Sequence, residues 1–157
     1  MTSLFAFLHH VAAFALVAAL AVELALLRGE LTASRARQLL SADRIYGISA
    51  GLVLIIGFAR VFYFEKGAHY YFHSIPFIAK LALFLVVGLL SIYPTLQFIS
   101  WRGDLRQGRA PALTEDRRRR LRSVVHLQLA LIVVLILCAA LMARGIGYVS
   151  QSSLSTA

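Results

Sequence analysis

The sequence predicts an integral membrane protein of the all-α class, in which four transmembrane helices form one bundle. Of its 157 residues, 60% are apolar and only 15% are charged, whereas roughly 25% of the residues of an ordinary soluble domain are charged. Four apolar runs are each long enough to cross the bilayer core as a helix. No segment alternates apolar and polar residues as a transmembrane β-strand does. Residues 1–149 are therefore expected to form a single bundle, and residues 150–157 a flexible tail.

The apolar runs give the order of the predicted helices. They extend from Leu4 to Leu27, from Ile45 to Phe64, from Pro76 to Ile99 and from Val124 to Ala143. The leading segment MTSLFAF has no Lys or Arg, and the first run is longer than the roughly 7 to 15 apolar residues of a signal peptide. We therefore expect the first helix to be retained.

Two smaller motifs concern the second and fourth helices. Gly47 and Gly51 stand four residues apart, a spacing that lets another helix approach closely, and they predict a contact with a second copy in a homodimer. Before the fourth run, Thr114, Glu115 and Asp116 predict a capped helical extension with acidic residues at its positive end.

Basic residues are concentrated in two of the three connecting loops. The first loop carries Arg28, Arg35, Arg37 and Arg44, and the third carries Arg102, Arg106, Arg109, Arg117, Arg118, Arg119, Arg120 and Arg122. The second loop carries only Lys66. Because Lys and Arg accumulate in cytoplasmic loops, both termini are predicted on the non-cytoplasmic side of a bacterial inner membrane. The net charge of +9 is then explained by topology and attraction to anionic lipids, with no nucleic-acid partner.

Ionisable residues within membrane helices usually face the protein interior, so helical periodicity predicts which ones meet. In the first helix, His9 and His10 point about 100° apart. Glu23 lies within about 40° of His9, which favours His9 as the inward residue. His10 would then face a neighbouring helix, a subunit or the interface.

The other three helices each show one polar stripe. The predicted stripes contain Tyr46, Ser49, Val53, Gly57 and Arg60 in the second helix, His73, Lys80, Phe84, Val87 and Ser91 in the third, and His126 and Arg144 in the fourth. With the termini outside, His9, Arg60, Lys80 and Arg144 form one layer beneath the outer surface, with His73 at its rim. Glu23 and His126 belong nearer the cytoplasmic side.

A layer of imidazole and cationic groups inside a four-helix bundle suits haem b, a flat apolar cofactor with acidic edges. His9 is the favoured axial ligand and His10 the alternative, while the second iron position is empty or filled by Lys80 or His73. Arg60, Lys66 and Arg144 would pair with the propionates. The sequence has no C-x-x-C-H, so attachment is non-covalent, and the lone Cys138 predicts neither a disulfide nor a zinc site.

Four stretches of the sequence resemble a known family. They are HHVAAF, DRIYG, GFARVFYFEKGAHYY and FIAKLALFLVVGLLSIYP, and they are similar to a family of uncharacterised bacterial four-helix membrane proteins. That family is more distantly similar to the membrane-bound protoporphyrinogen oxidase of the HemJ type, which is associated with haem b. The resemblance implies roles for His9 or His10 and for Lys80. The first span lacks the Trp that follows the histidine in those oxidases, and the third ends in Tyr93 and Pro94 where they have a further His.

Three functions are consistent with these residues. The first is haem b binding with a redox role or a reaction with a small oxidant or gas. The second is oxidation of protoporphyrinogen or another tetrapyrrole, with Lys80 as the catalytic residue or Arg60 holding substrate carboxylates. The third is a small transporter or structural protein with a proton relay, although the helices have neither the breaks nor the repeated halves typical of carriers.

Overall fold

The computed structural model describes residues 2–59, 62 and 75–143. Five helices follow one another: α1 (Thr2–Leu26), α2 (Ala33–Ala59), α4 (Ile75–Ser100), α5 (Arg102–Arg106) and α6 (Glu115–Ala143). Four of them, α1, α2, α4 and α6, are long and apolar enough to cross a membrane. The predicted all-helical architecture, with four helices long and apolar enough to span a membrane, is confirmed for the described residues.

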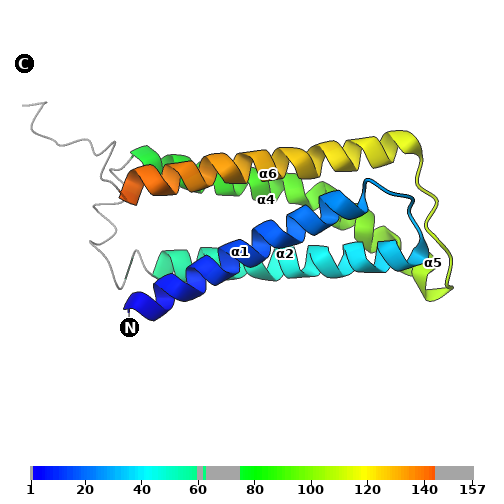
Figure 1. Cartoon of the computed structure of the whole chain (residues 1–157), viewed down its shortest axis with the longest axis horizontal. Coiled ribbons are helices and arrows are strands. Elements are labelled where there is room, and N and C mark those ends of the chain that lie inside the picture. The colour runs from blue at the N-terminus through cyan, green and yellow to red at the C-terminus, as the bar shows by residue number, and fades with distance from the viewer. Residues whose placement is uncertain (1, 60–61, 63–74, 144–157) are drawn as a thin grey trace, which may run out of the picture.

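The four long helices form two antiparallel pairs (Figure 1). α1 packs along α2, and α4 packs along α6; α1 also reaches α6, whereas α2 and α4 touch over a shorter stretch. We call the end that carries α5 and the loops 27–32 and 107–114 the basic end, and the end at which α1 begins the terminal end. The ribbons of the two pairs diverge toward the terminal end.

Two helices begin earlier than the apolar runs predict. α2 begins at Ala33 rather than at Ile45, and the Thr32 hydroxyl accepts a hydrogen bond of 3.2 Å from the Arg35 N–H at its start. α6 begins at Glu115 rather than at Val124, which confirms the predicted extension. Both extensions are polar. Hydropathy therefore predicted the start of the apolar run in each helix, but not the start of the helix itself.

The basic end is held together by side chains that bond to the backbone of other elements. The Arg37 guanidinium donates to the Leu105 carbonyl oxygen over 3.3 Å, and the Arg118 guanidinium donates to the Gly29 carbonyl oxygen over 3.1 Å. Arg118 also pairs with Glu115 one turn earlier in α6. These bonds join α2 to α5 and the first loop to α6.

One glycine at this end has a backbone conformation that disfavours other residues. Gly108 has a φ of 71°, and its N–H donates to the Leu105 carbonyl oxygen just after α5. We expect Gly108→Ala to lower the free energy of unfolding by about 1 kcal/mol, since a Cβ is strained at positive φ. Thermal unfolding in detergent measures this. Gly103→Ala is the control, because Gly103 is helical with open space around its Cβ position and should tolerate alanine; equal melting temperatures for the two variants would contradict the expectation.

The tightest packing is in the basic half of the bundle. Leu20 and Leu27 of α1, Leu39 of α2, Phe98 of α4 and Leu121 of α6 are all fully buried there. The Phe98 and Trp101 rings lie 5.1 Å apart between centroids, which fixes α4 against the turn into α5. The less tightly packed terminal half contains the cavity described below.

The glycine face of α2 lies on the outside of the bundle. No heavy atom lies within 4 Å of the position a Cβ would take on Gly47 or Gly51. Their neighbours Ile48 and Ile55 are also exposed. The face is therefore accessible, and its use in a homodimer stays a prediction.

Candidate functional site

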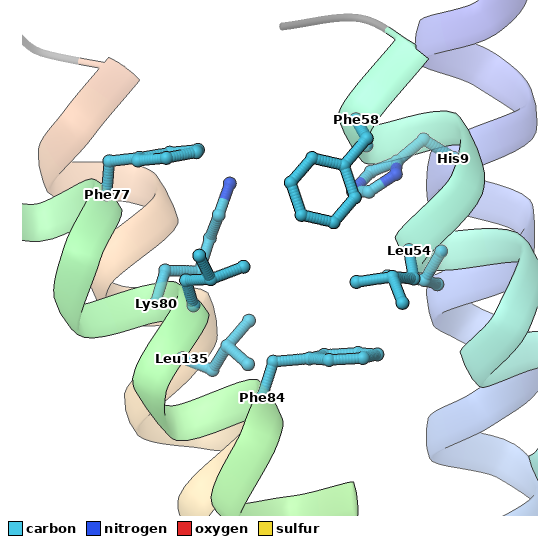
Figure 2. Close-up of a pocket in the computed structure, with 10 residues that line it drawn as sticks. His9, Leu54, Phe58, Phe77, Lys80, Phe84 and Leu135 are labelled. Carbon is cyan, nitrogen blue, oxygen red and sulfur yellow. The ribbon is translucent and has the colours of Figure 1, made fainter. Parts of the chain in front are cut away.

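An apolar cavity of about 70 Å³ lies in the terminal half, between the two helix pairs (Figure 2). All four long helices line it. Its walls are formed by His9 of α1, Val53, Leu54, Gly57 and Phe58 of α2, Phe77, Lys80, Leu81 and Phe84 of α4, and Leu135 of α6. The only ionisable groups among these lining residues are the His9 imidazole and the Lys80 amine.

The His9 ring rests against the backbone of α2 at Gly57. A Cβ added to Gly57 would stand 3.4 Å from His9 Cε1 and 3.8 Å from its Nδ1, which is van der Waals contact, so a side chain larger than that of alanine would meet the ring. Ala12, Leu16 and Glu23 follow His9 along the same buried face of α1. The prediction that His9 faces inward is confirmed.

His10 points away from the cavity. It is exposed, and its Nδ1–H donates a hydrogen bond of 2.6 Å to the Ala6 carbonyl oxygen on its own helix. The His9 and His10 rings are 6.2 Å apart between centroids and nearly perpendicular. Of the two candidate histidines, only His9 lines the cavity.

Lys80 stands on the opposite wall. Figure 2 shows it rising from α4 between Phe77 and Phe84, across from His9, Phe58 and Leu54. Its ammonium lies 5.5 Å from the centroid of the Phe77 ring, a cation–π distance that stabilises the charge beside an aromatic face. Phe84 and Val87 continue inward along α4, as predicted.

Four predicted site residues cannot be placed. Arg60, Lys66, His73 and Arg144 lie outside the described residues, as does the predicted tail. Of the expected layer, the structure therefore shows His9 and Lys80. It brings these two to one cavity from different helix pairs.

The predicted inward face of α6 is wrong at His126. This residue is exposed and borders a surface groove together with Arg28 and Arg122. Gln128, on the opposite side of α6, is fully buried instead. The imidazole of His126 lies close enough to the basic end to remain outside the bundle, where its polar tip avoids burial.

Sequence reasoning also missed a buried polar group in the basic half. Asp43 of α2 accepts a hydrogen bond of 2.6 Å from the Thr95 hydroxyl of α4, and the Gln128 amide donates one of 3.3 Å to the Val87 carbonyl oxygen. Glu23, assigned to this side of the bundle, is 1% exposed. Gln128, a lone amide within an otherwise apolar stretch of sequence, could have indicated a buried polar group here.

A lipid-facing groove adjoins the cavity between α2 and α4. It has a volume of about 590 Å³, and Leu54, Phe58, Leu81 and Phe84 border both the groove and the cavity. The groove is apolar along its whole length. The cavity and the groove therefore share four apolar side chains.

The described residues do not contain a ligand set for a bare metal ion. No group of three or more His, Cys, Asp or Glu side chains is close enough to hold one within residues 2–59, 62 and 75–143. The cavity lining instead offers one imidazole, one amine and three Phe rings.

Comparison with known proteins bears on the class of the chain. A family model described as "Predicted membrane protein (DUF2214)" matches residues 1–147. No curated protein and no solved structure matches the chain. These comparisons support a membrane protein and give no support to the more distant resemblance to the HemJ-type oxidases.

Proposed function

The chain belongs to the DUF2214 family of predicted membrane proteins, and from this premise we propose that it binds haem b in the cavity between His9 and Lys80. The observation that supports the proposal is the pairing of a histidine with a cation on opposite walls of an aromatic cavity. A haem needs an iron ligand, apolar cover for its ring and a positive group for its propionates. The described part of the cavity offers one of each.

The size of the site favours a ligand that reaches in from the membrane. Cofactor sites typically measure about 300–1,000 Å³, and the cavity alone measures about 70 Å³. The adjoining groove of about 590 Å³ supplies the remaining space. A tetrapyrrole in this site would occupy the cavity and the groove together, with Phe58 and Phe84 along both.

Each residue then has a distinct role. His9 would supply the protein ligand to the haem iron, since a porphyrin supplies four nitrogens and needs only one or two more ligands from the protein. Gly57 would let the imidazole lie against α2. Lys80 would pair with a propionate or, as a neutral amine, supply a second ligand. Bound haem supplies one-electron chemistry or the capture of a small oxidant or gas.

The surrounding bundle would determine what reaches the site. The walls are apolar except for His9 and Lys80, so water is largely excluded and the attraction between the ammonium and a carboxylate is strong. Arg60, Lys66, His73 and Arg144 remain candidates for further contacts at the terminal end. With loops one and three in the cytoplasm, the site would lie near the outer face of a bacterial inner membrane.

The test is an absorption spectrum of the purified protein. After expression with a supply of haem, we expect a Soret band that shifts on reduction with dithionite and co-elutes with the protein. A well-folded protein without a Soret band would rule out the proposal. Reconstitution of the apoprotein with hemin in detergent gives the stoichiometry, which is expected to be one haem per chain.

A second candidate function, oxidation of a tetrapyrrole, would use the same residues of the cavity. Lys80 stands where it would hold a carboxylate of protoporphyrinogen, which makes it the candidate catalytic residue of a tetrapyrrole oxidase. Rescue of cells that lack their own oxidase separates the two functions. Haem binding without rescue by the well-expressed protein favours the first.

A further inference from the structure

A second polar site lies in the basic half of the bundle, away from the cavity. All four long helices contribute to it: Glu23 from α1, Asp43 and Tyr46 from α2, Ser91 and Thr95 from α4, and Gln128 from α6. The exposed fractions of Glu23 and Gln128 are 1% and 0%, and that of Asp43 is 9%. Two carboxyl groups are thus enclosed inside a membrane-spanning bundle.

Tyr46 connects the members of this site. Its hydroxyl lies next to the side chains of Ser91 and Gln128, and within electrostatic range of both carboxyl groups. Glu23 and Asp43 also lie within electrostatic range of each other. The residues therefore form one group rather than a set of separate polar contacts.

The two carboxyl groups have different surroundings. Asp43 accepts the Thr95 hydrogen bond and faces the Arg102 guanidinium of α5 at the basic end. Both contacts stabilise a negative charge on Asp43. Glu23 is the more deeply buried of the two, and a negative charge on Asp43 would disfavour a second negative charge on Glu23.

Two acceptor atoms of this site lack a hydrogen-bond donor. Among the described residues, the buried oxygens Glu23 Oε1 and Gln128 Oε1 have no hydrogen-bond partner. Both atoms are acceptors, and a buried acceptor without a donor costs about 1–3 kcal/mol. An ionised carboxylate buried without a cation costs several kcal/mol more.

We propose that Glu23 is a proton-binding site that exchanges its proton with the solution at the basic end. Binding converts the acceptor-only carboxylate into a carboxylic acid with one O–H to donate toward the Gln128 amide oxygen or the Asp43 carboxylate. One proton adds the missing donor and removes the uncompensated charge. Asp43, which lies within electrostatic range of Arg102 at the basic end, is the intermediate on the route.

Few charged or titratable groups surround Glu23. α2 contributes Asp43 and Tyr46, and the Arg102 side chain of α5 interacts electrostatically with Asp43. α4 and α6 present the neutral Ser91, Thr95 and Gln128, while Arg122 and His126 of α6 are exposed on the outer surface. No third His, Cys, Asp or Glu joins the pair within the described ranges, which favours a proton over a metal cation.

Carbodiimide labelling tests the site on the full chain in detergent, with or without haem. Dicyclohexylcarbodiimide reacts with protonated carboxyl groups in apolar surroundings, so peptide mass spectrometry should find the adduct on Glu23. The exposed Glu30 and Glu115 serve as internal controls and should stay unlabelled. Labelling should fall as the pH is raised, and Glu23→Gln should reduce it to background.

A second measurement does not depend on any variant. The infrared spectrum of the wild-type protein should contain a carbonyl band of a protonated carboxyl group that shifts in D₂O and is missing from Glu23→Gln. Absence of both the band and the adduct from the wild type would overturn the proposal. Protection of Glu23 from the reagent by excess Na⁺ at constant pH would also overturn it, because the site would then bind a metal cation.

Discussion

Replacement of His9 by Ala is expected to abolish the Soret band of the haem-loaded protein, whereas His10→Ala is expected to retain it. His9 lines the cavity between the helix pairs, while His10 is exposed and bonded to Ala6. The two variants remove the same side chain from adjacent positions of one helix. They therefore differ only in which face of α1 loses its imidazole.

The measurement is a hemin titration of each apoprotein, followed by absorbance. Loss of the axial ligand should weaken binding by at least about a hundredfold, equivalent to about 2.8 kcal/mol. Alanine favours the helix, so circular dichroism and gel filtration should show both variants folded. Normal hemin binding by a folded His9→Ala protein would rule out His9 as the ligand, and loss of binding in His10→Ala alone would assign that role to His10.

The second large effect is expected from Gly57→Val, a substitution that touches no ionisable residue. A Cβ at this position would already be in van der Waals contact with His9 Cε1, at 3.4 Å, and valine adds two methyl groups beyond it. We expect these methyl groups to displace the imidazole or to separate the helices, and such overpacking typically costs about 1–3 kcal/mol. We expect hemin affinity to fall at least about tenfold, which is about 1.4 kcal/mol.

Gly51→Val is the matched control on the same helix. Nothing lies within 4 Å of its Cβ position, so the added methyl groups project from the outer face of α2. Hemin affinity should stay within about twofold of the wild type, a change below about 0.5 kcal/mol. If both valines weakened binding equally, the effect would belong to helix propensity, and the close fit between His9 and α2 would have no part in it. Gel filtration of the same control also reports on the predicted homodimer.

Helical periodicity predicted three of the four inward faces correctly. On α1, Glu23 selected the His9 face over the His10 face, because two ionisable residues within about 40° of each other have a common reason to avoid lipid. On α2 and α4 the stripes through Tyr46 and Lys80 also point inward. On α2 and α4 the prediction rested on several residues of one helix.

The fourth face was wrong at His126, the described member of its predicted polar pair. His126 is exposed near the basic end, where a polar side chain can stay outside the bundle. Gln128, two residues further on and on the opposite face of α6, is buried. The neutral amide was therefore a better guide to the inward face of α6 than the ionisable residue beside it.

The sequence predicted one layer of residues from all four helices, but it could not predict how far apart the two helix pairs stand at the site. Wheel angles give the face of one helix, and hydropathy gives the length of a span, but neither says how far two pairs separate. The shared border of cavity and groove, at Leu54, Phe58, Leu81 and Phe84, depends on how α2 and α4 approach each other. That distance is set by the packing of all four helices together.

The groove between α2 and α4 bears on how any affinity for this protein should be measured. A ligand that arrives through it dissolves in the bilayer or micelle first, so its concentration in the lipid phase governs occupancy. Apparent dissociation constants should then rise in proportion to the amount of detergent or lipid added, because the same ligand is diluted into more apolar volume. Only values expressed as mole fraction in the lipid phase would agree between preparations.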